Sequence, residues 1–248
     1  MKDLLLRTLR HESTERAPWV PFAGVHAGHL KGYTATEMLT DADKAFESLM
    51  EVNRLYKPDG QPVIFDLQIE AECLGCGLTW ADDCPPSVSS HPLDGSDEEP
   101  PVTPCDCKIP TKESGRIPYV LDVMHRMKEA VGDTTALYGL ICGPFTLASH
   151  LRGNNLFTDM FDFEEEVESL FAFCNRVCMK MADYYIEAGM DVIALVDPLI
   201  SQISTAHFEQ YMLEPYTGLF HHIRAQGALS SFFVCGDPTR NIELMCQT

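Results

Sequence analysis

Residues 135–144 read TALYGLICGP, and residues 191–198 read DVIALVDP. Each is a short apolar run that ends in a Gly-Pro or Asp-Pro step, which is typical of a buried strand in a parallel sheet. Between the two, residues 164–188 carry apolar side chains at helical spacing, and the three Glu that open this segment suit the positive end of a helix dipole. Strand, helix and strand in this order predict a parallel βαβ unit.

The same alternation continues on both sides of this unit. Further apolar runs predict strands at residues 18–23, 62–66 and 230–235. Helical spacing predicts helices at residues 41–56, 116–131 and 206–226, the first capped by Thr40 or Asp41 and the last interrupted at Pro215. Because five strands cannot close an eight-stranded barrel, the pattern predicts either an open α/β sheet or part of a barrel.

Residues 81–115 differ from the rest of the chain. They hold seven of its 16 Pro and an acidic run at residues 94–99. A segment of this length without a periodic pattern is typical of a functional or mobile loop. We expect a Pro-rich excursion at the mouth of the barrel.

The composition is that of a globular protein, with 45% hydrophobic and 22% charged residues in a chain of 248 residues. Asp and Glu together number 37 and Lys and Arg number 18, so the formal net charge is −19. A surface this acidic repels phosphate backbones and anionic lipids, which argues against nucleic acid or a membrane as a partner. No apolar run approaches the ~18 residues of a membrane span, and no signal peptide is visible, so we expect a cytoplasmic protein whose ten Cys are thiols.

The chain resembles the uroporphyrinogen decarboxylase (URO-D) superfamily, which includes the methylcobamide:coenzyme M methyltransferases. The matching segments follow one another in family order: Arg16-Ala17-Pro18, residues 65–72 with Leu74-Gly75-Cys76, residues 143–148, Asp197-Pro198 with Ile203-Ser204, Glu214-Pro215-Tyr216, and Cys235-Gly236-Asp237. The resemblance implies a (β/α)8 barrel of the TIM-barrel type. It also implies that residues 1–248 form a single, incomplete barrel domain, with about five βα units present and the last units absent.

Two features decide between branches of the superfamily. The decarboxylases carry an Arg-Gln-Ala-Gly-Arg motif after the first strand, and here Val25 and His29 stand at the two Arg positions. Guanidinium groups are natural partners of substrate carboxylates, so their loss argues against uroporphyrinogen as the substrate. The run Ile69-Glu70-Ala71-Glu72 and the Leu-Gly-Cys that follows it look more like the methyltransferase branch.

The methyltransferase branch implies zinc and a corrinoid. Its members bind zinc through a His-x-Cys pair after the fifth strand and a distal Cys, and the zinc lowers the pKa of a substrate thiol. Here Cys235 matches the first Cys, and Phe233 stands at the His position. The resemblance thus implies Cys235 as one metal ligand, and a corrinoid on a partner protein as methyl donor. A decarboxylase needs no cofactor.

The candidate site residues follow from their positions at the ends of the predicted strands. Asp66 matches the family's catalytic Asp, and His150 stands where the family has a Tyr. We expect Asp66, Glu70, His29 and His150 to be catalytic, and His26, Glu72, Asp197 and Ser201 to bind substrate. Like charges at one mouth raise a carboxyl pKa, which suits acid–base catalysis. Asp66 and Asp197 also fit helix or loop capping, and the two His near the first strand also fit a surface loop.

Three functions remain open from the sequence. The first is corrinoid-dependent methyl transfer to a thiol-type acceptor. The second is uroporphyrinogen decarboxylation, a lyase reaction of porphyrin biosynthesis. The third is a degenerate barrel fragment that only binds. An open barrel exposes two strand edges, so we also expect the chain to associate, for example as a homodimer.

Overall fold

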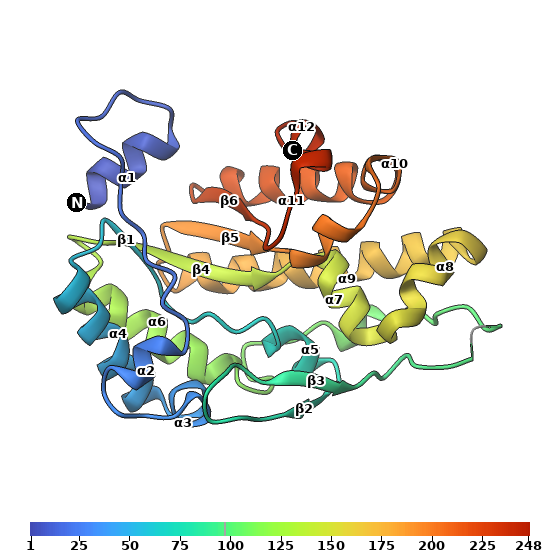
Figure 1. Ribbon diagram of the computed structural model, residues 1–248, viewed down its shortest axis with the longest axis horizontal. Helices are drawn as coiled ribbons and strands as arrows, with labels where there is room; N and C mark the ends of the chain where they lie inside the picture. Colours follow the sequence, from blue (N-terminus) through green and yellow to red (C-terminus); the bar gives the residue numbers. More distant parts are fainter. Residues whose placement is uncertain (97) are drawn as a thin grey trace.

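The computed structural model describes residues 1–96 and 98–248. Its main sheet has four parallel strands in the order β1 (Gly60–Pro62), β4 (Ala136–Cys142), β5 (Val192–Val196) and β6 (Leu229–Phe233). In Figure 1 helices α9 (Glu164–Glu187) and α11 (Leu213–Ala225) run alongside these strands, and both pack against them. Within the described residues the sheet is open. The fold is therefore of the (β/α)8-barrel type, with an incomplete set of strands.

The two central strands of the sheet, β4 and β5, are buried on both faces. Tyr138 lies opposite Val192, and Val192 lies opposite Leu229. Alternate residues of β4, such as Leu137 and Ile141, join the core beneath the helices. The residues between them, with their counterparts on β5, pack on the inner face against α1 (Lys2–Leu9) and an aromatic cluster. Burial on both faces explains why β4 and β5 read as continuous apolar runs.

The expected strand at residues 18–23 is wrong. This segment is extended but forms no ladder with the described strands. The Trp19 carbonyl accepts hydrogen bonds from the backbone N of Asp59 and Gly60, and the Trp19 backbone N donates to the Asp59 carboxylate. Pro18 and Pro21 explain the difference, because neither can donate a backbone hydrogen bond to a neighbouring strand. The expected strand at 62–66 is displaced as well, since β1 ends at Pro62.

The predicted helices are found with small shifts of their ends. Residues 41–56, 116–131 and 164–188 correspond to α4 (Ala42–Tyr56), α6 (Ile117–Val131) and α9. Residues 206–226 are helical as well, from α10 (Thr205–His207) through a π-helical turn at Phe208–Met212 to α11; the irregular turn ends before Pro215, which lies within the regular α11, so the expected interruption at Pro215 itself is wrong. The other helices are α2 (His26–His29), α3 (Ala35–Thr40), α5 (Ile69–Cys73), α7 (Pro144–Arg152), α8 (Leu156–Asp162) and α12 (Ile242–Met245). None of the described helices is long and apolar enough to cross a bilayer.

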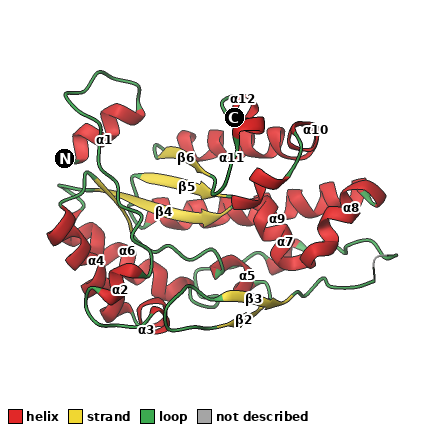
Figure 2. Cartoon of the chain, in the orientation of Figure 1, coloured by secondary structure: helices red, strands yellow, loops and turns green. Residues whose placement is uncertain are grey.

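Residues 81–115 are mostly loop, as Figure 2 shows. Strand β3 (Ser87–Ser90) pairs antiparallel with β2 (Gly77–Thr79), and a 3-10 turn covers Asp106–Lys108. The buried Arg152 guanidinium holds the acidic part in place by donating to the carbonyls of Leu93 and Glu99. Asp97 lies outside the described residues. Cys105 and Cys107 are joined by a disulfide, so the expectation that all ten Cys are thiols is wrong at this pair.

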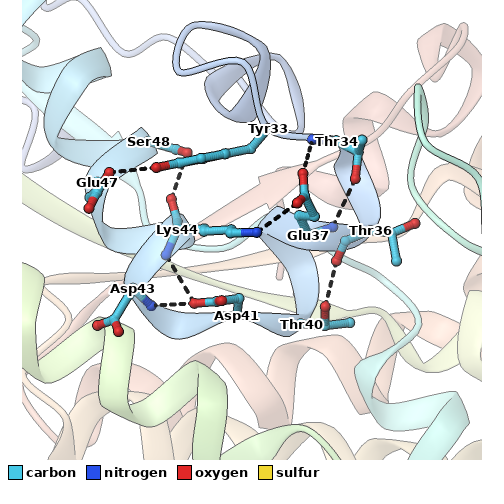
Figure 3. Close-up of polar contacts among 10 residues, drawn as sticks. All are labelled: Tyr33, Thr34, Thr36, Glu37, Thr40, Asp41, Asp43, Lys44, Glu47 and Ser48. Atoms are coloured by element: carbon cyan, nitrogen blue, oxygen red, sulfur yellow. Dashed lines mark hydrogen bonds and ion pairs between the residues drawn. The ribbon is translucent and has the colours of Figure 1, made fainter.

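Helix α4 begins at a side-chain cap, which Figure 3 shows together with the polar contacts around it. One carboxylate oxygen of Asp41 accepts hydrogen bonds from the backbone N of Asp43, at 2.9 Å, and of Lys44, at 3.2 Å. Of the two expected caps, Asp41 is therefore the correct one. Helix α3 begins with a capping box in which the Thr34 and Glu37 side chains accept from each other's backbone N.

We predict that Asp41→Ala lowers the free energy of unfolding by about 1 kcal/mol, because two donors at the start of α4 lose their acceptor. Asp41→Ser, which keeps an acceptor in place, should lose less than half as much. Urea unfolding of the two variants and the wild type measures the difference. Equal midpoints for Asp41→Ala and the wild type would contradict the assigned cap.

Candidate functional site

Polar side chains that follow β1 and β5 meet around the carboxyl end of β4. Glu70, on α5, accepts a hydrogen bond at Oε1 from the backbone N of Cys142, the last residue of β4, at 3.1 Å. Asp197, directly after β5, accepts hydrogen bonds from the first turn of α7, the helix that follows β4. Two carboxyl groups thus hold the edge of the sheet that corresponds to a barrel mouth.

Asp66 forms an ion pair behind this edge. One of its carboxylate oxygens lies 2.6 Å from Nη1 of Arg116, and the other accepts from the backbone N of Gln68 at 2.9 Å. Arg116 Nε donates in turn to Glu72 at 2.6 Å, and its guanidinium group stacks over Trp80. One cation therefore faces two carboxylates. Asp66 fixes the loop between β1 and α5, and its charge is compensated.

Glu70 is a buried carboxyl group, with a side chain and backbone only 1% exposed. Desolvation raises its pKa to about 8, and the neighbouring charge of Asp66 adds to the effect, whereas hydrogen bonds such as that from Cys142 N oppose it. Its Oε2 has no hydrogen-bond partner among the described residues. Burial therefore favours the protonated form of Glu70 at neutral pH.

Asp197 is the most heavily bonded carboxylate of the molecule's described part. It accepts from the backbone N of Phe145 and Thr146 at 3.1 and 3.0 Å, and from the hydroxyls of Thr146 and Tyr216, the latter at 2.7 Å. Burial raises its pKa to about 6 despite these hydrogen bonds. Gly143 permits the approach, because a Cβ there would lie 2.1 Å from an Asp197 oxygen. Of the two roles left open by the sequence, Asp197 performs the capping of α7.

A cavity of about 410 Å³ opens next to the loop that carries Asp66. It is lined by residues 22–26, Phe65, Leu67, Gln68 and Pro85, and we call it the mouth cavity. His26 is its titratable lining residue, whereas Asp66 lies between two lining residues with its carboxylate directed to Arg116. Behind the lining, Phe22 stacks on Phe233 with ring centroids 4.9 Å apart, and Phe65 meets Phe233 edge to face.

The other predicted site residues lie away from the lining. His29 is exposed on α2, on the same helix as His26. His150 is enclosed at the end of α7, where burial lowers its pKa to about 4 and its carbonyl accepts from Cys76 and His91. Ser201 donates to the Pro198 carbonyl. The structure therefore brings Asp66, Glu70, Glu72 and Asp197 to one edge, and it places His26 alone of the predicted residues on the mouth cavity.

The described residues do not fit a zinc site of the implied kind. Cys235 is exposed just after β6, and the Phe233 ring is committed to the aromatic cluster. Zinc sites use three or four His, Cys, Asp or Glu ligands that converge on one point. No group of three such side chains within the described residues could hold a metal ion. The single donor Cys235 is not a metal centre on this geometry.

Sequence reasoning missed three residues that shape the site. Arg116 was placed only at the start of a helix, and its pairing with Asp66 spans 50 residues without a local signal. Thr146 and Tyr216 fell inside segments quoted for the family resemblance, but nothing near them in the sequence indicates that both bond Asp197. A polar residue inside an otherwise apolar helix face was the available signal for both.

Comparisons with known proteins agree on one family. A sequence model of the uroporphyrinogen decarboxylase (URO-D) family matches residues 1–248. The methylcobamide:CoM methyltransferase MtbA of Methanosarcina acetivorans is 28% identical over 253 residues, which cover 100% of this chain and 73% of the relative. A uroporphyrinogen decarboxylase of Synechococcus is 23% identical over 222 residues, 84% of this chain and 61% of the relative. A solved methyltransferase structure from Methanosarcina mazei has a TM-score of 0.87 and 23% identity, and covers 99% of this chain and 73% of that one.

We predict that Asp197→Ala lowers the free energy of unfolding by about 3–5 kcal/mol, because it strands several buried donors of α7 and Tyr216. Asp197→Asn retains one acceptor oxygen, so its free energy of unfolding should lie between those of the wild type and Asp197→Ala. Asp183→Ala is the control, since its partner His222 is half exposed and the expected loss is below about 1 kcal/mol. Urea unfolding measures all three, and a loss for Asp197→Ala no larger than the control's would contradict the role.

We also predict that Glu70 makes the folded state less stable as pH rises from 6 to 8. In this range the unfolded carboxyl group is ionised while the folded one, with its pKa raised to about 8, keeps its proton. The folded state binds more protons, so stability falls by up to about 1.4 kcal/mol per pH unit. Glu70→Gln should remove this slope, whereas Glu72→Gln should keep it. Unfolding free energies at pH 6, 7 and 8 test the difference, and parallel wild-type and Glu70→Gln profiles would refute it.

Proposed function

This chain belongs to the uroporphyrinogen decarboxylase (URO-D) family over residues 1–248, and we propose its function on that premise. Within that family we assign it to methyl transfer. The methyl donor is a methylcobamide on a partner corrinoid protein, and the acceptor is a small molecule with a thiol group. The observation that carries this proposal is the similarity to MtbA, which extends over the whole chain.

The charges of the mouth support methyl transfer over decarboxylation. A porphyrinogen carries several carboxylates, and proteins bind such groups with Arg or Lys side chains. The described residues that line the mouth cavity include neither. The nearby Arg116 is already paired with Asp66 and Glu72, each at 2.6 Å. A polyanion would therefore meet the net charge of −1 that Asp66, Arg116 and Glu72 carry together at this edge.

The reaction places simple demands on the residues of the mouth. The acceptor sulfur forms a bond to the methyl carbon, the carbon–cobalt bond breaks with its electron pair left on cobalt, and the thiol proton must leave. We place the acceptor in the mouth cavity and assign removal of that proton to the exposed imidazole of His26, whose Nε2 lies 3.4 Å from the Tyr56 hydroxyl. Asp66 and Glu70 act behind the lining, because their contacts hold the loop and helix that follow β1. The described His, Cys, Asp and Glu side chains do not converge on a zinc site.

The test is an assay of methyl transfer from methylcobalamin to a panel of thiols. The reaction is monitored by the loss of the cobalt–carbon absorption, and the methyl thioether is detected by mass spectrometry. His26→Ala should lower the rate at least about 10-fold, because a proton acceptor is lost from the cavity. His125→Ala, at an exposed position of α6 that does not line the mouth cavity, is the control and should leave the rate unchanged. Equal rates for both variants would remove His26 from the reaction.

Two other outcomes decide against the function itself. Decarboxylated products from uroporphyrinogen, with no thioether formed, would assign the chain to the decarboxylases. No turnover of methylcobalamin with thiols and none of porphyrinogen, in a folded protein supplied with zinc, would favour a barrel that only binds.

A further inference from the structure

The walls of the mouth cavity are apolar. Phe22 and Phe65 present ring surface, Leu67 and Pro85 present aliphatic surface, and the cavity volume of about 410 Å³ lies in the range of small-molecule sites. Two lining side chains are polar, those of His26 and Gln68. The Gln68 side chain makes no hydrogen bond to the described residues, not even as the N-cap of α5. Its amide is therefore free to meet a neutral polar group on a ligand.

The surroundings of the cavity disfavour a second anion. Asp66, Arg116 and Glu72 together carry a net charge of −1, and Arg116 gives its Nη1 and Nε to the two carboxylates. A sulfonate or carboxylate brought into an apolar cavity loses its hydration, and it regains stability only from a cation or several donors. The described lining offers neither Lys nor Arg.

Aromatic geometry adds a positive preference. Phe22, Phe65 and Phe233 already form one stacked and two edge-to-face pairs, with centroids 4.9 to 6.2 Å apart. An aromatic ring placed against Phe22 or Phe65 can add a further pair of the same kind, which contributes affinity beyond area alone.

We infer that the acceptor of the mouth cavity is an uncharged thiol with an aromatic or aliphatic body, and that the cavity discriminates against thiols bearing a sulfonate, carboxylate or phosphate. This inference rests on the proposed function and narrows it. It sets the chain apart from its MtbA relatives, which are named as methyltransferases acting on CoM.

The test measures binding without any methyl donor, so that it is independent of turnover. Its probes are a matched pair of product-like thioethers, benzyl methyl sulfide and the same molecule with a para-sulfonate, which cannot exchange with the exposed Cys235 or with the disulfide. Calorimetry on the full chain should show at least a 10-fold tighter Kd for the neutral probe. Equal or tighter binding of the sulfonate overturns the inference.

Variants of the lining residues test whether the preference for the neutral probe arises in the mouth cavity. Gln68→Arg places a guanidinium group in the cavity and should tighten sulfonate binding at least 10-fold, whereas Gln68→Met should not. Pro85→Arg is a second variant at an exposed rim position, in case the first perturbs folding. Gln247→Arg adds the same charge at an exposed position near residue 248 and should change nothing. If neither Gln68→Arg nor Pro85→Arg alters the Kd of either probe, the binding is elsewhere and the inference fails.

Binding and turnover then separate the two hypotheses. Tight binding of the neutral probe without methyl transfer to any thiol supports the cavity's preference and contradicts the proposed function. Methyl transfer to sulfonated thiols in preference to benzyl mercaptan supports the function and contradicts the preference.

Discussion

The mouth of this barrel depends on a buried carboxylate that accepts four hydrogen bonds. Asp197 stands at the end of β5, two of its donors are backbone N atoms of α7, and Tyr216 reaches it from α11. Three segments that are far apart in the sequence, residues 143–148, 197–198 and 214–216, therefore meet at one side chain. The family resemblance was read from these same segments. These segments cap the start of α7 and hold the edge of the sheet together around the Asp197 side chain.

A second set of polar residues stabilises the mouth without lining the cavity. Arg116 balances Asp66 and Glu72, and Glu70 sits protonated against the end of β4. These four residues hold the loop after β1 and α5, so the acidic appearance of the mouth in the sequence does not translate into an acidic cavity wall. What reaches the cavity is mainly ring and aliphatic surface. The polar residues at the edge give it shape, and its selectivity comes from the apolar ones.

Much of the fold could be predicted because its signals are local. The apolar runs of β4 and β5 and the periodicity of α9 depend only on neighbouring residues, and so does the cap at Asp41. The segment 18–23 failed because composition suggested a strand while Pro18 and Pro21 removed the donors that a ladder requires. Within the site, the positions of Asp66 and Glu70 were predicted, but the partners of their side chains were not. These partners, Arg116 and Cys142, lie 50 and 72 residues away in the sequence. Pairings of this kind leave no trace in local pattern.

The rings of Phe22 and Phe233 join the first extended segment of the chain to its last described strand across the inner face of the sheet. Tyr138 and Phe65 extend the contact on either side of Phe22. Two rings of this aromatic layer, Phe22 and Phe65, line the mouth cavity. Family members that differ in ring size here would accommodate guests of different length while every polar contact of the rim stayed the same. Ring size in this layer, rather than charge at the rim, is then the dimension along which related barrels can diverge.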